Sequence, residues 1–402
     1  MITPACVSYS GCSLYIHVPF CIRKCDYCPF FSKDNESAQS VNLYFDALFK
    51  ELNEIVFSKD RPFETVFIGG GNPGLLGAER LMKIARLLNE KGKVREFTIE
   101  MNPESLTDDM EVLFSSSKVT RLSIGIQSLD ERHLKTLMRS ASLSATLKAL
   151  ERTAYYHDRY GTDISVDLMT CIPSQKVEDT IADIDTIIRR GHVDHISLYN
   201  LTYEEGTKLA ERLSSGSLIL IAEEQQRESL ITLWDYLEEN GYHQYEISNF
   251  SRTKETRCLH NERYWNLSDY IGVGPSAVGT FHDGESVIRR TGVSDIETYC
   301  TENDEKRYIF EELSTKEQIL ECLLVSLRKN EGIDKNDFNK RFPIDFSTFF
   351  STQLKMIERQ FGSITVDTRD NFRLLRDGLL LCDSFIELFA DPVFDLSDPL
   401  DR

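Results

Sequence analysis

The sequence has no run of about 18 apolar residues, the length that a membrane-spanning helix requires. Its first residues, MITPACVSYSGCS, have neither the basic start nor the apolar stretch of a secretion signal. Basic residues are also scarce, because 46 Lys and Arg stand against 65 Asp and Glu and give a net charge of -19. Such a chain repels nucleic acid and anionic membranes. We therefore expect a cytoplasmic protein with no integral membrane segment and no nucleic-acid partner.

The 10 cysteines do not have the distribution of a disulfide framework, because one group is clustered and the others are scattered. The clustered stretch, HVPFCIRKCDYCPFF, contains Cys21, Cys25 and Cys28 but no fourth cysteine. A structural zinc site needs four ligands, so zinc would have to recruit Cys12, His17 or a distant cysteine. Three thiolates can instead hold a 4Fe-4S cluster and leave one iron open to a further ligand. The spacing favours the cluster, with zinc as the alternative.

The first half of the chain alternates strand-like and helical segments. Six βα units in series predict an α/β fold with parallel strands buried on both faces, as in a barrel or partial barrel. The predicted strands cover residues 13–18, 65–71, 96–103, 121–128, 163–173 and 195–202.

Polar residues recur where these strands end. The cysteines follow the first strand and the glycines of TVFIGGG follow the second, while Glu100, Gln127 and Asp167 lie at or near the ends of the next three. Right-handed crossovers bring the carboxyl ends of all these strands to one rim. We therefore expect the functional site at that rim.

After residue 203 the alternation fails. The charged stretch TENDEKR, residues 301–307, has the composition of a linker, and Ser314 with Glu317 forms a helix-capping signal beyond it. Further helices and a predicted hairpin over 364–375 resemble a small winged-helix-like domain, for which the acidic chain favours packing or docking over DNA binding. The expected organisation is a barrel core over 1–203, an α+β extension over 204–300 and a C-terminal domain over 301–402.

The motif CxxxCxxC, with Tyr27 before its last cysteine, resembles the signature of the radical S-adenosylmethionine (SAM) superfamily. The segments LYIHVPFCIRKCDYC, FIGGGNP, IGIQSLDERHLKTLMR, DLMTCIPSQ, HISLYNLT, YEISNF and HNERYW follow one another in the order found in one branch of that superfamily. This branch contains the oxygen-independent coproporphyrinogen III oxidases and the HemW heme chaperones. The resemblance implies a partial (β/α)6 radical SAM barrel for the core.

The same resemblance implies how the cofactors are held. Cys21, Cys25 and Cys28 would ligate the 4Fe-4S cluster, and SAM would chelate the open iron through its amino and carboxylate groups. An electron donor could then pass an electron through the cluster to the sulfonium of SAM and yield a deoxyadenosyl radical. Arg139 offers a fixed charge for the SAM carboxylate, and acids and amides offer hydrogen bonds to its ribose and amino group. The implied SAM contacts are Tyr15, Gly70, Gly71, Asn72, Glu100, Gln127, Arg139 and Asp167.

The chain also departs from the family pattern. Asn72 stands where threonine is usual, Gly74 where serine is usual, Ala141 where histidine is usual, and Cys171 where glycine is usual. The oxidases carry a further cysteine where this chain has Phe30, and they lack the HNxxYW segment. Both of these last differences favour the chaperones.

In HNERYW, His260 is a candidate axial ligand for heme, and Tyr264 and Trp265 are candidate walls for the macrocycle. The alternative interpretation is a buried turn that contains a hydrogen-bonded histidine and two core aromatics. We predict a heme chaperone that binds heme and transfers it to an unidentified acceptor protein. The alternatives are a coproporphyrinogen oxidase and, more remotely, a zinc-stabilised interaction protein.

Overall fold

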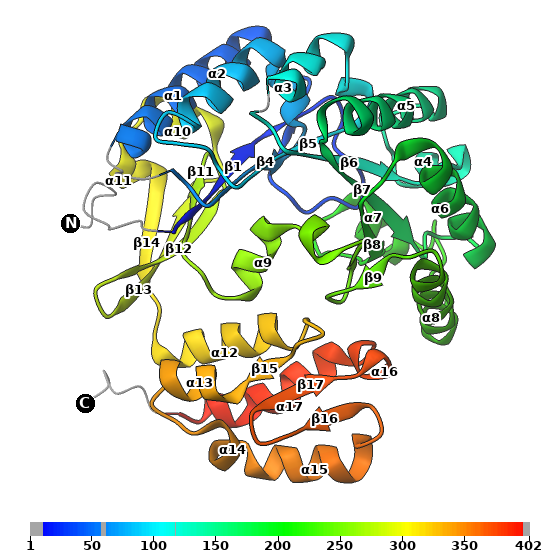
Figure 1. Ribbon diagram of the computed structural model, residues 1–402, viewed down its shortest axis with the longest axis vertical. Coiled ribbons are helices and arrows are strands. Elements are labelled where there is room, and N and C mark those ends of the chain that lie inside the picture. The colour runs from blue at the N-terminus through cyan, green and yellow to red at the C-terminus, as the bar shows by residue number, and fades with distance from the viewer. Residues whose placement is uncertain (1–10, 58–61, 117, 397–402) are drawn as a thin grey trace.

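A computed structural model describes residues 11–57, 62–116 and 118–396 of the chain. Its centre is a curved sheet in which six successive parallel strands are neighbours, with helices on the outer, convex side (Figure 1). This is the predicted partial (β/α)6 barrel. The strands are β1 (Ser13–Val18), β4 (Thr65–Gly70), β5 (Glu96–Met101), β6 (Arg121–Gln127), β7 (Asp163–Thr170) and β8 (His195–Asn200). The outer helices are α1 (Ala38–Phe57), α2 (Ala78–Leu88), α3 (Glu111–Ser115), α4 (Glu131–Thr136), α5 (Leu143–Tyr160) and α6 (Val177–Gly191).

Along each strand, fully buried apolar residues that join the hydrophobic core alternate with mostly polar or small residues that face the barrel interior. In β1, Leu14, Ile16 and Val18 are fully buried, as are their counterparts Val66 and Ile68 in β4. The other face of β1 carries Ser13, Tyr15 and His17, so the signal that located the strands in the sequence was an apolar residue at every second position.

The region after β8 extends both edges of the sheet. On one side, β10 (Asn249–Ser251) pairs with β8 and β9 (His243–Gln244). On the other side, β11 (Tyr270–Val273) pairs in parallel with β1, followed by β12 (Val278–Asp283), β13 (Ser286–Gly292) and β14 (Tyr308–Glu312). The helices of this region are α7 (Lys208–Ser214), α8 (Glu223–Glu239), α9 (Leu259–Trp265), α10 (Ile296–Thr301) and α11 (Asp304–Arg307).

The predicted linker over 301–307 is wrong. These residues complete α10 and form α11, and the chain then enters β14, which pairs with β13 in the main sheet. The stretch is charged because it lies at the surface, where Glu305 and Lys306 are exposed. We therefore propose that the third domain begins after β14 and not at residue 301.

The C-terminal part contains helices and a small three-stranded sheet. The predicted capping signal is confirmed, because the Ser314 side chain accepts from the backbone of Glu317 while Glu317 accepts from the backbone of Ser314. The predicted hairpin is β16 and β17, which β15 completes. The elements are α12 (Thr315–Ser326), β15 (Ile333–Asp334), α13 (Lys335–Arg341), α14 (Phe346–Phe349), α15 (Ser351–Phe361), β16 (Thr365–Asp367), β17 (Asn371–Leu374), α16 (Arg376–Leu379) and α17 (Cys382–Phe394).

This C-terminal part lies across the open side of the barrel, next to α9 (Figure 1). Within the described part of the chain, no helix combines the length and apolarity that a bilayer span requires.

Candidate functional site

A cavity of about 730 Å³ opens at the carboxyl rim of the parallel strands. Most of the residues predicted from the sequence meet there, although they come from distant parts of the chain. The strands bring them together because each lies in or after the carboxyl end of a strand. The predicted residues that line the cavity are Cys21, Cys25, Cys28, Gly70, Gly71, Glu100, Gln127, Arg139 and Asp167.

The three clustered cysteines lie in the loop after β1, partly exposed and without disulfide bonds. Tetrahedral ligation of one zinc ion would bring thiolate sulfurs to about 3.8 Å from one another. Among the described residues, these cysteines do not belong to any set of three or more ligand atoms within 4.8 Å. Neither predicted extra zinc ligand is available, since Cys12 is fully buried and both ring nitrogens of His17 are hydrogen-bonded. The three sulfur atoms therefore lie farther apart than ligands of one zinc ion do, and this separation suits a 4Fe-4S cluster better.

Arg139 reaches the cysteine loop from the segment after α4. Its guanidinium donates to Asn102 Oδ1 at 3.0 Å and to the carbonyl of Gly125, and it lies 3.5 Å from the sulfur of Cys25. The Nε of Arg139 and the Oε1 of Gln127 are buried and have no hydrogen-bond partner among the residues that the structure describes. Two unpartnered polar atoms on residues of one cavity wall are expected where a polar ligand belongs.

Glu100 and Asp167 give the cavity floor its acid character. Burial, and then the nearby Asp167 carboxylate, raise the pKa of Glu100 to about 8. Burial raises the pKa of Asp167 to about 6. The Glu100 carboxylate accepts the backbone N–H of Gly70 at 3.3 Å. Paired buried acids at such a site would gain most from a ligand that carries positive charge or donates hydrogen bonds.

The glycines are required by the protein's own packing. A Cβ at Gly71 would lie 2.4 Å from the carbonyl oxygen of Phe20, and one at Gly70 would lie 2.6 Å from the His17 ring. Gly70 also has a φ of 104°, which side chains disfavour. Both glycines line the cavity, but close approach of β1 and of the residues that directly follow it is sufficient to explain them.

Two predicted contacts of this cavity do not lie on it. Asn72 is fully buried, and it donates to Ser105 Oγ at 2.7 Å and accepts from the backbone N–H of Asn102. Asn72 therefore supports the wall from behind, with Gly74 packed beside Ser105. Tyr15 points into the barrel interior, where its hydroxyl bonds the His17 ring at 3.0 Å.

The barrel interior holds a second cavity of about 540 Å³. It shares Gly70, Glu100, Asp167 and Tyr199 with the first cavity, and His260 lies in its wall. The interpretation of His260 as a ready heme ligand is not supported by its surroundings. Its Nδ1 bonds Thr65 Oγ1 at 2.7 Å, its Nε2 bonds the Tyr264 hydroxyl at 2.6 Å, and the residue is 1% exposed. Both nitrogens that could bind iron are thus already used.

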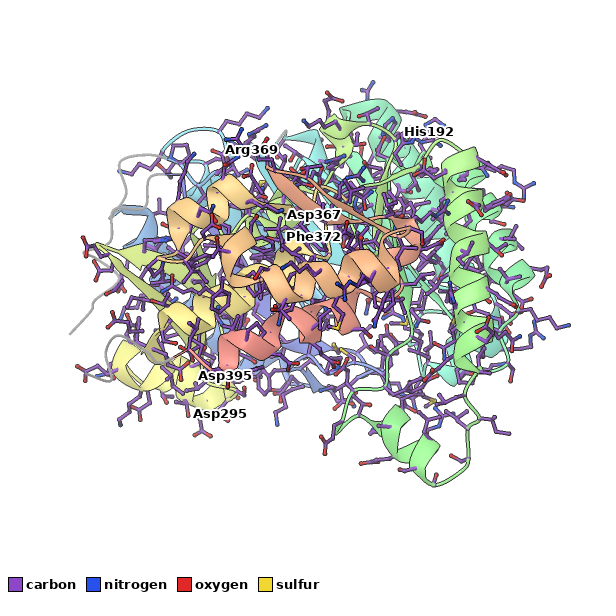
Figure 2. The ribbon with its side chains drawn as sticks, turned by 90° about the horizontal axis from the view of Figure 1, so that it is seen from below. His192, Asp295, Asp367, Arg369, Phe372 and Asp395 are labelled. Atoms are coloured by element: carbon purple, nitrogen blue, oxygen red, sulfur yellow. The ribbon has the colours of Figure 1, made fainter. Side chains whose placement is uncertain are left out.

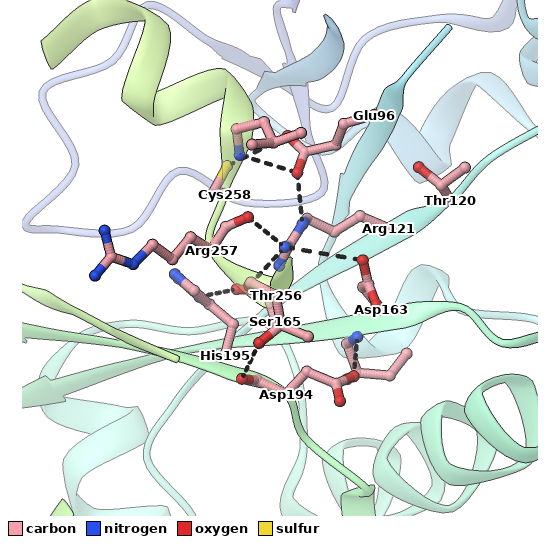
Figure 3. Close-up of polar contacts among 12 residues, drawn as sticks. Glu96, Thr120, Arg121, Asp163, Ser165, Asp194, His195, Thr256, Arg257 and Cys258 are labelled. Atoms are coloured by element: carbon pink, nitrogen blue, oxygen red, sulfur yellow. Dashed lines mark hydrogen bonds and ion pairs between the residues drawn. The ribbon is translucent and has the colours of Figure 1, made fainter. Parts of the chain in front are cut away.

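The helix that carries His260, α9, is fixed to the amino ends of the strands (Figure 3). Glu96, the first residue of β5, accepts the backbone N–H groups of Leu259 at 3.0 Å and His260 at 2.9 Å. It also pairs with the buried Arg121 at 3.2 Å, which donates to the carbonyls of Thr256 and Arg257. Since the cysteines follow the opposite end of β1, His260 and the cysteines lie at opposite ends of the barrel.

Sequence reasoning missed the contribution of the C-terminal part to the first cavity. Arg328 and the turn before α17 line it together with Trp234 of α8. No local pattern marks these residues, because only the packing of one domain on another brings them to the cavity. The buried pair Glu96 and Arg121 was also missed, although opposite charges at the first positions of two neighbouring strands were a visible signal.

Residues 15–187 match the Radical SAM superfamily, and residues 313–381 match the HemN C-terminal domain. Heme chaperone HemW of Bacillus subtilis is 31% identical over 85% of this chain and 90% of its own length. Heme chaperone HemW of Lactococcus lactis is 29% identical, over 94% of this chain and 97% of its own length. The mitochondrial radical S-adenosyl methionine domain-containing protein 1 of Danio rerio is 31% identical, over 93% of this chain and 86% of its own length.

Among solved structures, the coproporphyrinogen III oxidase HemN from Escherichia coli superimposes with a TM-score of 0.80. The alignment covers 96% of this chain and 92% of that one at 19% identity. At that identity the match establishes the shared fold.

Proposed function

This chain belongs to the radical SAM superfamily, in its HemN-like branch and close to HemW, and on that basis we propose that it is a heme chaperone. It binds heme and passes it to an acceptor protein, on a core that holds a 4Fe-4S cluster and SAM. The observation that carries the proposal is similarity to heme chaperones along almost the whole of both chains.

The residues at the first cavity fit the two resident cofactors. Cys21, Cys25 and Cys28 supply three thiolates and no fourth, which suits a cluster with an open iron. Arg139 and Gln127 line the cavity wall, where a guanidinium and an amide suit the carboxylate and amino group of SAM. When bound, the cluster supplies one-electron chemistry to SAM.

The protein's own residues then orient SAM. Arg139 holds its guanidinium beside Cys25 and offers a fixed positive charge next to the cluster loop. Glu100 and Asp167 line the floor, where hydroxyl and ammonium donors of the ligand would be accepted. An electron donor for the cluster and the acceptor protein for heme are further partners that the proposal requires, in a reducing compartment such as the cytoplasm.

Binding of heme through His260 requires a local rearrangement. The imidazole can offer Nε2 to iron once its hydrogen bond to Tyr264 opens, while Thr65 keeps Nδ1 bonded and fixes the tautomer. The second cavity, against which His260 lies, has aromatic walls that include Tyr15, Phe67 and Tyr264.

The alternative function is that of a coproporphyrinogen oxidase, favoured by the shared fold alone. Anaerobic reconstitution with iron and sulfide, followed by separate titrations with heme and SAM, tests the proposal. Saturable heme binding without decarboxylation of coproporphyrinogen supports a chaperone, and decarboxylation would support the oxidase. Stoichiometric zinc in place of iron would support the zinc-stabilised interaction protein.

A further inference from the structure

Two helices end close together at the amino ends of β7 and β8. His157 and Asp158 lie in the last turns of α5, shortly before β7 begins. His192 follows the last residue of α6, shortly before β8 begins, and is labelled at the periphery of the molecule in Figure 2. The cysteine loop follows the carboxyl end of β1, so this cluster lies at the opposite end of the parallel strands.

The three side chains come within ligating distance of a common point. One ligand atom each from His157, Asp158 and His192 can be chosen so that all lie within 4.8 Å of one another. His192 Nδ1 already lies 2.8 Å from Asp158 Oδ1. Around a tetrahedral zinc ion, ligand atoms lie about 3.4 Å apart, so modest side-chain rotations would close the set. The side chains of Asp158 and His192 are 61% and 52% exposed, which leaves them free to make those rotations.

His157 is held in the tautomer that a metal needs. Its Nδ1 faces two oxygens, Asp194 Oδ2 at 3.2 Å and the carbonyl of Thr162 at 3.3 Å. Facing two acceptors, Nδ1 carries the proton and leaves the Nε2 lone pair free. Asp194 is itself fixed, because it also accepts the backbone N–H of Ile164 at 2.9 Å. A carboxylate that orients a histidine in this way is the usual outer partner of a metal-binding imidazole.

The two helix ends favour a cation through their dipoles, and they also carry the side chains of Arg159 and Arg189, the latter of which donates to the carbonyl of Asp185. The carboxyl ends of both helices, of 18 and 15 residues, carry partial negative charge and meet here. His192 has a φ of 45° at the end of α6, in the left-handed conformation that closes the helix and turns the chain toward β8. The nearby Arg190 is paired with Glu151, and Arg252 donates to the carbonyl of Val193.

From these contacts we infer a binding site for a first-row divalent cation such as Zn²⁺, formed by His157, Asp158 and His192 and supported by Asp194. Two imidazoles and one carboxylate suit zinc, nickel or copper better than magnesium or calcium. Solvent would complete the coordination. The inference is independent of the heme and SAM functions, because it uses no residue of either cavity.

The test uses the full chain without a histidine tag, with its iron–sulfur cluster reconstituted so that the cysteines are occupied. Calorimetric titration with ZnCl₂ should show saturable binding of one ion, and X-ray absorption at the zinc edge should show imidazole and oxygen ligands without sulfur. His192→Gln and His157→Gln should each weaken binding at least about tenfold. Asp194→Asn, which touches no metal, should weaken it about 10- to 100-fold.

His243→Gln is the matched control, because His243 forms an exposed pair with Glu238 at 2.9 Å but belongs to no three-residue set among the described residues. It should bind zinc like the parent protein. Absence of saturable binding, sulfur in the zinc shell, or equal affinity of the parent and His192→Gln proteins would each overturn the assignment.

Discussion

Glu96 and His260 are joined directly, although 164 positions separate them: the Glu96 carboxylate accepts the backbone N–H of His260 at 2.9 Å. The same carboxylate holds the buried guanidinium of Arg121. One acid therefore caps α9 and neutralises a charge inside the barrel. The position of the HNERYW segment depends on this contact.

Glu96→Gln should lower the free energy of unfolding by about 3 kcal/mol, because it removes the nearer of the two carboxylates that pair with the buried Arg121 and leaves only Asp163 at 4.0 Å. Urea unfolding followed by circular dichroism measures the effect. Glu64→Gln is the matched control, since Glu64 pairs with the exposed Arg95 at 3.1 Å, and it should change stability by less than about 1 kcal/mol. Equal effects of the two substitutions would contradict the role of Glu96.

Tyr264→Phe separates the two roles of His260. It removes the hydroxyl that bonds Nε2 at 2.6 Å but keeps the aromatic ring. If His260 binds heme iron after that bond opens, heme affinity should rise while stability falls by about 1 kcal/mol. Absorbance titration with heme, alongside thermal unfolding, gives both quantities. Lower stability with unchanged heme affinity would assign His260 a purely structural role.

The stability conferred by His260 should depend on pH. Burial, and then the positive charge of Arg263, lower the pKa of His260 from 6.5 to about 3. Below pH 6.5 the unfolded chain takes up a proton that the folded chain refuses, so this stabilisation is lost as the pH falls from 6.5 toward 3.

Urea unfolding at pH 7 and pH 5 should therefore show the stability gap between the parent protein and His260→Gln shrinking, by up to about 2 kcal/mol. Other groups titrate in both proteins and cancel in the difference. A gap that stays constant or widens at pH 5 would show that the folded protein protonates His260.

Arg139→Ala should weaken the effect of SAM on the cluster. The paramagnetic resonance spectrum of the reduced cluster should change when SAM binds the open iron, and the loss of the guanidinium beside Cys25 should raise the SAM concentration needed about tenfold or more. Arg132→Ala, at an exposed position on α4, is the control. A spectrum indifferent to SAM in the parent protein would contradict the proposed site.

Coproporphyrinogen should not be converted to protoporphyrinogen at a useful rate. Phe30 is 61% exposed where the oxidases have a further cysteine, and Ala141 is buried where a histidine is usual. Small displacements of reacting groups are costly to such reactions. Product analysis under strict anaerobiosis provides the check, and turnover comparable to that of an authentic oxidase would contradict the expectation.

Structural features that depend on residues close together in the sequence could be predicted from local sequence patterns. The six parallel strands were visible because every second residue in them is apolar, and the Ser314 cap was visible because it needs only Glu317 nearby. The gathering of the cysteines, Glu100 and Gln127 at one rim followed from strand direction alone. Contacts between residues that are far apart in the sequence could not be predicted from local patterns. His260 gains its partners from Thr65 and Tyr264, and the charged stretch before β14 packs beside the sheet, which no local pattern reveals.

The most direct test of the central claim is a titration of the cluster-reconstituted protein with heme, followed by its absorbance. We expect saturable binding of heme at a fixed stoichiometry, together with about four irons per chain that depend on Cys21, Cys25 and Cys28. A protein that carries its cluster but shows no saturable heme binding would contradict the assignment as a heme chaperone.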